Sequence, residues 1–146
     1  VLFGPIPAVS STASIPMGTA APLVTDGVEI WNTTMAPTAT NSNVRIGTSF
    51  SFDFSQNNTE LIVAFFRDTV CIGSALMTGT TKKFPVQFTT TIYDQPNTTL
   101  PVVYSCRVGK VTGVTFYINR TQDLLAALGG TLESQAYTVE EIGVSP

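Results

Sequence analysis

Apolar and polar residues alternate with a period of two in several separate stretches of the chain. In residues 49–54 three phenylalanines alternate with two serines and Asp53. This pattern is typical of a strand with one buried and one solvated face, so Asp53 is expected to be exposed. The run 60–67 is instead almost continuously apolar and rich in β-branched and aromatic residues, which predicts a strand covered on both faces.

Residues 101–118 (PVVYSCRVGKVTGVTFYI) are the stretch around which the rest of the chain is interpreted. Alternating apolar residues occupy both halves, and the segment 109–113 between them begins and ends with glycine. Period-two alternation on both sides of a glycine-containing turn predicts a β-hairpin.

About eight such stretches follow one another at steps of roughly 8 to 12 residues, which is the spacing of small antiparallel β-folds. The sequence therefore predicts an all-β fold, an antiparallel β-sandwich or barrel (jelly-roll-like) of about eight strands. At most one short helix is expected, over residues 121–128, before a pair of glycines. The predicted core consists of Phe50, Phe52, Phe54, Ile62, Phe65, Val86, Phe88, Ile92, Val102, Tyr104, Cys106, Val114, Phe116 and Ile118.

Two segments differ in composition. Residues 1–22 are rich in Pro, Ala and Ser and are predicted to be an extended arm or linker, whereas residues 23–146 form the β-barrel or sandwich domain. The arm is expected to lie on another surface or on the domain itself, and a partly disordered tail is an alternative for some of it. The start without Met or a basic region indicates a segment of a longer polypeptide without a signal peptide.

Composition narrows the function classes. Charged residues make up 12% of the chain and the net charge is -3, so there is no basic surface for nucleic acid and no polybasic membrane patch. We therefore expect no nucleic-acid partner. No apolar run approaches the roughly 20 residues of a membrane span, so we also expect no membrane insertion. Histidine is absent, which removes the commonest general base and the commonest zinc ligand.

The sequence accordingly predicts no catalytic residues, no cofactor and no metal site, and the chain is expected not to be an enzyme. Glu140 and Glu141 are adjacent, so in a strand they point to opposite faces, and we expect a solvated edge. Cys71 and Cys106 lie within apolar strand patterns and are interpreted as two buried thiols, with a disulfide as the alternative.

Polar loops are the remaining candidates for function. Loops 32–43, 56–59, 78–83 and 95–99 are rich in Thr, Ser, Asn and Gly, which suit adaptable hydrogen bonding on a rigid β-scaffold. The candidate binding residues on these loops are Asn32, Thr38, Asn41, Asn57, Asn58, Thr80, Lys82, Lys83, Gln95 and Asn97. Four N-glycosylation sequons begin at Asn32, Asn57, Asn97 and Asn119, and they matter only in a secretory compartment; otherwise they arise by chance.

Three motifs carry a resemblance to a known family. LIVAFFRDTVCIG (61–73), PVVYSCRVGKVTGVTFYI (101–118) and GGTLESQAYTVEEIGV (129–144) resemble strands near the C-terminal end of the protruding domain of calicivirus capsid proteins. The resemblance covers roughly residues 61–144 with gaps, and the family's distal receptor-reading subdomain has no counterpart. It implies a reduced protrusion on the capsid of a small non-enveloped RNA virus.

That resemblance sets the functional expectation. The chain would be a structural protein, a protruding domain on the virion surface with a role in host-cell attachment, assembled in the host cytoplasm and extracellular when released. Its partners would be copies of itself in a homodimer, the capsid shell subunits, and a host receptor or glycan. Two uncharged patches, 35–43 and 84–93, are candidates for the homodimer contact. The alternatives are a lectin-like carbohydrate-binding module or phage fibre tip domain, and an enzyme with an unfamiliar site.

Overall fold

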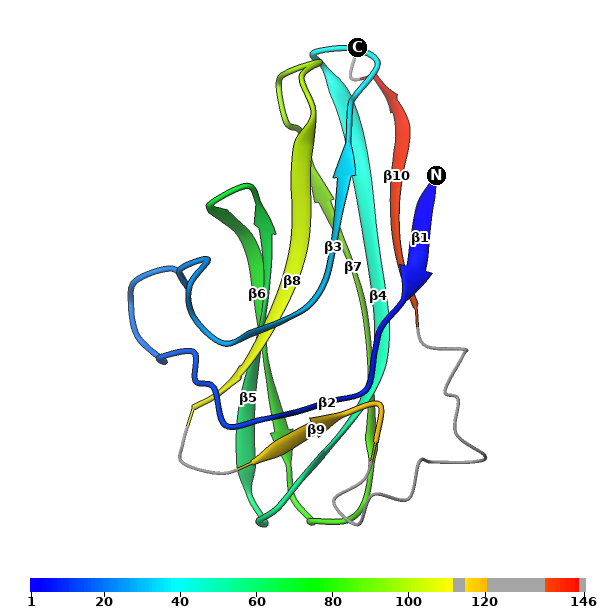
Figure 1. Cartoon of the computed structure of the whole chain (residues 1–146). Coiled ribbons are helices and arrows are strands. Elements are labelled where there is room, and N and C mark those ends of the chain that lie inside the picture. The colour runs from blue at the N-terminus through cyan, green and yellow to red at the C-terminus, as the bar shows by residue number, and fades with distance from the viewer. Residues whose placement is uncertain (112–114, 121–135, 145–146) are drawn as a thin grey trace.

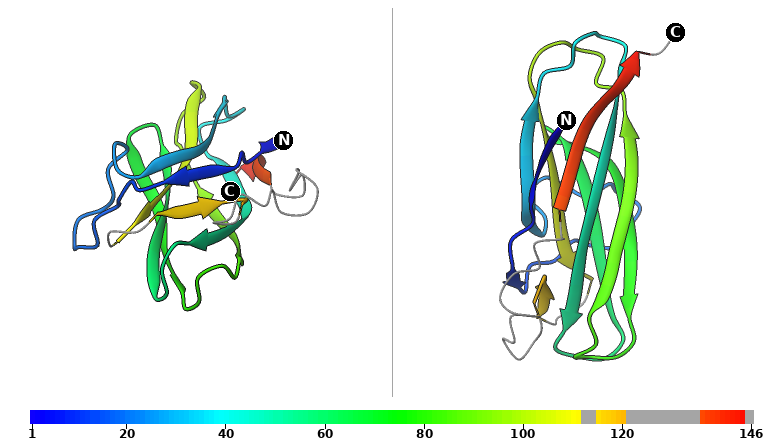
Figure 2. Two further views of the ribbon diagram at one scale, coloured as in Figure 1. Left: turned by 60° about the horizontal axis from the view of Figure 1, so that its bottom comes forward. Right: turned by 90° about the vertical axis from the view of Figure 1, so that its right-hand side faces the viewer.

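The protein is a β-sandwich in a computed structural model that describes residues 1–111, 115–120 and 136–144. Those residues form ten strands in two antiparallel sheets that pack face to face (Figure 1), and the side view in Figure 2 shows the two layers edge-on. The prediction of an all-β sandwich is therefore confirmed. The expected helix at 121–128 and the core residue Val114 lie outside the described residues. Over the described part of the chain, there is no helix with the length and apolarity needed to cross a membrane.

Each sheet has a simple order. Sheet A contains β1 (Leu2–Pro5), β10 (Ala136–Val144), β4 (Ser42–Phe54), β9 (Phe116–Ile118), β2 (Val9–Ser11) and β7 (Val86–Asp94). Sheet B has the order β3 (Val28–Met35), β8 (Val102–Lys110), β5 (Thr59–Arg67) and β6 (Val70–Gly79). Strand β4 connects the parts of sheet A, since it pairs with β7 along one side and with β10 and then β9 along the other.

The apolar patterns of β4 and β5 predict correctly which of their faces are buried. In β4 every second side chain points into the core, and the phenylalanines at 50, 52 and 54 are buried. Strand β5 is covered on both faces, as its apolar run predicts. Leu61, Val63 and Phe65 face the core between the sheets. The alternate residues join a second cluster on the outer face of sheet B, which Ile15 from the N-terminal segment completes.

The N-terminal segment lies along the domain itself. Strand β1 pairs with β10 and β2 pairs with β9 in sheet A, and the chain then crosses to sheet B. There the Ile15 amide donates to the Lys110 carbonyl (3.1 Å) and the Lys110 amide donates to the Ala13 carbonyl (3.0 Å). Residues 1–15 thus connect the two sheets as a strap.

The predicted hairpin over residues 101–118 is wrong. Strand β8 lies in sheet B between β3 and β5, whereas β9 lies in sheet A beside β4. The alternation in both strands correctly identified their buried faces. Those faces point into one core from opposite sheets, and a period of two does not specify which strand is the neighbour.

Most of the predicted core residues are buried, and the exceptions cluster on β7. Phe88 and Ile92 are only partly buried, and Val86 is 39% exposed, because β7 lies at the edge of sheet A and is less completely covered. Asp53 is a second correction, since it is fully buried instead of exposed. Its carboxylate accepts hydrogen bonds from the backbone amides of Phe54 and Lys83, both at 2.8 Å, because the β6–β7 loop folds over it.

The disulfide alternative is also wrong, because both cysteines are free thiols. Cys106 is fully buried, as expected, and burial raises its pKa well above the usual value. Cys71 is only half-buried, and partial burial raises its pKa as well, so neither thiol is activated as a nucleophile.

Candidate binding surfaces

The structure separates the candidate loop residues into two groups at opposite ends of the sandwich. We call the end with the β3–β4 and β7–β8 connections the upper end, as it is oriented in Figure 1, and the end with the β4–β5 and β6–β7 connections the lower end. Asn32 belongs to neither group, because it lies within β3 and not in the predicted loop. Its side-chain amide donates to Glu29 of the same strand.

At the lower end two loops are joined by hydrogen bonds. The Lys82 amide donates to the Asn57 side chain (2.9 Å), and the Asn58 amide donates to the Thr80 carbonyl (3.4 Å). Asn58 and Lys83 both have left-handed backbone conformations, with φ of 53° and 65°. This conformation is uncommon for a lysine, and the hydrogen bond from the Lys83 amide to buried Asp53 holds it in place.

At the upper end the remaining candidates are brought together. The Gln95 side chain donates to the Asn41 carbonyl (3.4 Å), and the Asn97 side chain donates to the Gln95 carbonyl (3.0 Å). Thr38 donates both its amide (3.0 Å) and its hydroxyl (2.6 Å) to the Glu141 carboxylate. The sequence placed these residues on separate loops, and the structure joins the loops into one polar surface.

Glu141 anchors the first of these loops to β10. Its carboxylate also accepts a hydrogen bond from the Ser42 hydroxyl. These hydrogen bonds, from Ser42 first and Thr38 second, hold the pKa of Glu141 below its usual value. Glu140 points to the other face and pairs with Arg45. Both glutamates are half-buried and have partners, so the expected solvated edge describes neither fully.

A partly buried ion pair lies beneath the second loop. Asp94, at the end of β7 in sheet A, accepts two hydrogen bonds from Arg67 of β5 (2.9 and 3.0 Å) and one from the Tyr104 hydroxyl of β8 (2.8 Å). Arg67 also donates to the Gln95 carbonyl (3.2 Å). Burial and the neighbouring Asp94 carboxylate raise the pKa of Tyr104 far above its ordinary value. We call Arg67, Asp94 and Tyr104 the inter-sheet clamp, because these residues connect the two sheets directly under loop 95–101.

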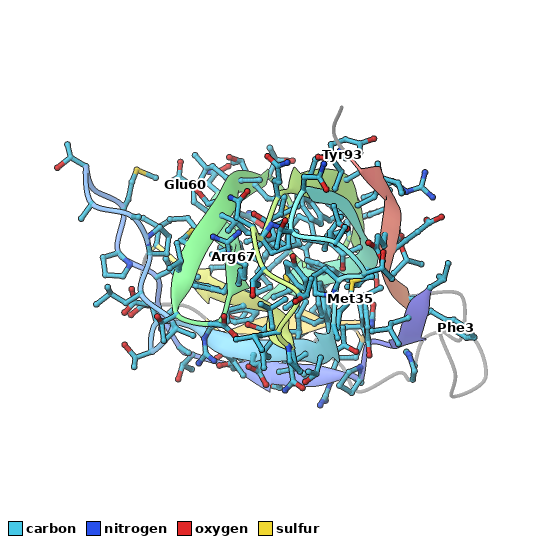
Figure 3. All side chains as sticks on the ribbon, turned by 90° about the horizontal axis from the view of Figure 1, so that it is seen from above. Phe3, Met35, Glu60, Arg67 and Tyr93 are labelled. Carbon is cyan, nitrogen blue, oxygen red and sulfur yellow. The ribbon has the colours of Figure 1, made fainter. Side chains whose placement is uncertain are left out.

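The upper end continues into the outer face of sheet A, which carries hydroxyl and amide side chains. Ser49 and Thr89 lie opposite each other and share a hydrogen bond (3.1 Å), and Gln87 donates to Ser49 (2.8 Å). At its junction with the upper end stands Tyr93, whose side chain is 64% exposed. Figure 3, seen from above, shows Arg67 toward the interior and Tyr93 at the rim.

Tyr93 was missed as a candidate. Its position directly after Ile92 in an alternating strand was the available signal, since alternation places it on the solvated face. We define the upper-end surface as Thr38, Asn41, Tyr93, Gln95 and Asn97.

The four sequons differ in accessibility. Asn32, Asn57 and Asn97 are exposed, whereas Asn119 is buried. The Asn119 side chain accepts a hydrogen bond from the Ser51 amide (3.0 Å) and donates one to the Ile6 carbonyl (2.8 Å). Its amide nitrogen is therefore engaged in the fold and inaccessible to a glycosyltransferase. Within the described ranges, no three His, Cys, Asp or Glu side chains are grouped so that they could hold a metal ion.

No family model matches the chain, and no curated protein matches its sequence. Among solved structures, the EclA C-terminal domain, a sugar-binding protein, aligns with a TM-score of 0.45 and 10% identity over 96% of this chain and 81% of its own. A chain of infectious bursal disease virus, Gx strain, aligns with a TM-score of 0.49 and 9% identity over 94% of this chain and 32% of that one. The Gt strain gives a TM-score of 0.47 and 11% identity over 97% and 36%.

This chain therefore spans about a third of each viral chain. At such low identity and TM-score these likenesses concern the arrangement of strands and do not extend to function. No calicivirus protein is among these three structures, so the similarity to that family depends on the sequence motifs alone.

Proposed function

We propose that this chain is a protruding surface domain of a viral capsid protein and that its upper-end surface binds a host receptor or glycan during attachment. It is a binding and structural module, not an enzyme. Its other partners are the capsid shell subunits and a second copy of itself. Its place is the virion surface.

One observation carries the proposal, namely that the polar loops of the upper end are held in place before any ligand arrives. The Arg67–Asp94 pair fixes one loop from below, and Glu141 fixes the other through Thr38. A preorganised surface loses less conformational entropy on binding than mobile loops do. Amide and hydroxyl groups beside an exposed aromatic ring suit a polar, uncharged ligand such as a glycan, because the ring provides an apolar contact and the amides provide hydrogen bonds.

A lectin-like carbohydrate-binding module is the second candidate, and it would use the same surface. The absence of charged side chains among the five residues that define the upper-end surface favours it equally. The two candidates differ in context, since a capsid protrusion acts on a particle and a lectin module acts as an isolated domain.

The test is binding of the fluorescently labelled domain to a panel of cultured cells and to a glycan array. Tyr93→Ala should abolish binding, and the matched control Phe3→Ala should retain it. Phe3 is also a strongly exposed aromatic residue (77%), but Figure 3 places it away from Tyr93. Equal binding by the two variants would contradict the assignment to the upper end. Tight binding of a simple glycan by the isolated monomer, with no incorporation into particles, would favour the lectin alternative.

A further inference from the structure

Exposed apolar side chains occur on β6, on β7 and on the loop between them. Five large hydrophobic residues on these strands or their connecting loop are exposed: Val70, Leu76, Phe84, Val86 and Tyr93. Two hollows lie there as well. One, of about 550 Å³, separates the outer face of β6 from segment 16–22, and another, of about 400 Å³, is lined by residues of the β6–β7 loop and the start of β7.

Strand β6 is an edge strand without the usual protection. It pairs with β5 on one side, and no strand within the described residues pairs with its other side. Edge strands are usually protected by charged residues, proline or bulges. The ten residues of β6 include no charged residue and no proline. A bulge at Ile72 disrupts only the first part of the strand, since the register from Gly73 to Gly79 is regular.

Strand β7, an edge strand of sheet A, differs in this respect. Strand β7 is preceded by Lys82, Lys83 and Pro85 and ends at Asp94. Both ends of β7 are therefore flanked by charged residues, whereas β6 has a large apolar side chain, Leu76 (53% exposed), in the middle of its regular half. The residue types thus favour β6 over β7 as an edge that accepts another strand.

We propose that two copies of this chain associate by antiparallel pairing of their β6 strands about a two-fold axis at Leu76. In this register Leu76 lies opposite the partner's Leu76, and Ser74 lies opposite the partner's Thr78. The pairing covers residues 73–79 of each copy and joins the two B sheets into one. It specifies the homodimer of the proposed function and rests on that proposal.

The charge distribution suits a second copy as the occupant of this edge. Across a two-fold axis each residue meets the same patch of its partner, so any charge near the axis meets a like charge. Because β6 carries none, the backbone hydrogen bonds form without electrostatic repulsion. The pairs at the contact are complementary by residue type, since leucine meets leucine and a serine hydroxyl meets a threonine hydroxyl.

Segment 16–22 forms the outer wall of this contact. The segment is tied at its base, where the Gly27 amide donates to the Ser14 carbonyl (2.9 Å) and Arg107 donates to the Gly27 carbonyl (3.1 Å). The hollow between this segment and Leu76 has room for outward-facing side chains of an added strand. Both walls of that hollow are uncharged, which agrees with an uncharged strand as its occupant.

The experiment combines sedimentation velocity over a concentration series with hydrogen–deuterium exchange at its two ends. Leu76→Lys places two ammonium groups at the axis and should raise the dimer dissociation constant about tenfold or more, because it also removes two buried leucines from the contact. The matched control is Leu100→Lys, since Leu100 is 71% exposed and lies outside the sheets. This control should leave the dissociation constant within about twofold of the wild-type value.

Hydrogen–deuterium exchange then identifies which strand forms the dimer contact. Amides of residues 73–79 should exchange more slowly at high protein concentration than at low concentration, while those of residues 86–94 should not change. A dimer with protection on 86–94, or one that Leu76→Lys leaves intact, would overturn the β6 assignment and leave the capsid proposal standing. A monomer at every concentration would overturn the pairing in solution. Loss of cell binding by Tyr93→Ala tests the attachment role separately, because Tyr93 lies outside the proposed contact.

Discussion

Asp94→Asn is the substitution that tests the inter-sheet clamp most directly. The asparagine side chain has nearly the same shape, so the change removes a charge and an acceptor without opening a cavity. Arg67 would lose its carboxylate partner, and the Tyr104 hydroxyl would face an amide that can present only one acceptor oxygen. Because Asp94 joins β7 to β5 and β8, the effect should fall on the packing of one sheet against the other.

The expected cost can be worked out from the exposure of the two partners. Removing one member of a buried ion pair typically costs about 3–5 kcal/mol, because the other charge stays behind without compensation. The Asp94 side chain is 9% exposed, but that of Arg67 is 24% exposed, so water can partly solvate the guanidinium that remains. We therefore expect a loss of about 2–3 kcal/mol. For a domain of this size that corresponds to a fall in melting temperature of roughly 6–9 °C.

Urea unfolding followed by tryptophan fluorescence provides the assay. Trp31 is the only tryptophan, it is buried, and it stacks on Tyr137 with ring centroids 4.5 Å apart, so its emission reports the native packing. Glu29→Gln is the matched control, because it removes a carboxylate that pairs with an arginine at 3.7 Å in a more exposed position. Only Glu29 is exposed in this pair (37%, against 17% for Arg107), but Arg107 keeps its hydrogen bonds to the Asp26 and Gly27 carbonyls. The loss should therefore be about 0–1 kcal/mol, and this variant should unfold close to the wild type.

A double-mutant cycle with Tyr104→Phe separates the two halves of the clamp. Because the phenol donates to the Asp94 carboxylate, the single changes should not be additive, and a coupling energy of about 1 kcal/mol is expected. If the unfolding free energy of Asp94→Asn lies within about 0.5 kcal/mol of the wild-type value, which is the usual size of surface effects, the clamp does not hold the sheets together. The inter-sheet clamp would then not preorganise the upper-end loops either.

Three further predictions concern other parts of the fold. Gly79→Ala should cost about 3 kcal/mol, because a Cβ there would lie 1.5 Å from a core phenylalanine ring of β4, whereas Gly18→Ala, in open space, should be neutral in the same urea titration. In native protein a thiol reagent should modify Cys71 slowly and Cys106 not at all, with both reacting in urea, and fast native reaction of Cys106 would contradict its burial. The pKa of Glu141 is lowered in the folded state. The stabilisation by its carboxylate is therefore complete above the unfolded pKa of about 4.3 and is lost as pH falls through the folded pKa. The difference in urea midpoint between wild type and Glu141→Gln should be present at pH 7 and vanish in acid.

The sequence was most informative where a strand has one or two well-defined apolar faces. Alternation located β4 and its buried phenylalanines, and the continuous run of β5 correctly indicated cover on both sides. It could not assign partners. The segment 101–118 appeared to be a hairpin because both halves alternate, yet β8 and β9 pair with strands distant in sequence and lie in different sheets.

Tertiary cover explains the remaining errors. Asp53 alternates with phenylalanines and has a solvent-facing position in its own sheet, but the β6–β7 loop buries it. Val86 shows the opposite error, because it was predicted to be buried. It points inward, but it lies on a strand at the edge of the sandwich and is 39% exposed. The upper-end surface was partly predictable, because its amide residues lie in polar loops. Their convergence was not, because it depends on Asp94, Arg67 and Glu141, which no local pattern singles out.

The path of β4 through sheet A has a consequence for the order in which the chain can fold during synthesis. All four strands of sheet B lie between residues 28 and 110, so a ribosome releases them before the last third of sheet A exists. Strand β4 emerges early, but its partner β10 begins only at residue 136, and β1 must wait for β10. Until translation has passed residue 144, the edge of β4 that pairs with β10 therefore has no partner in the nascent chain. Such an unpaired strand edge is exposed to neighbouring chains. Fast elongation over residues 111–144 would shorten that interval and limit aggregation.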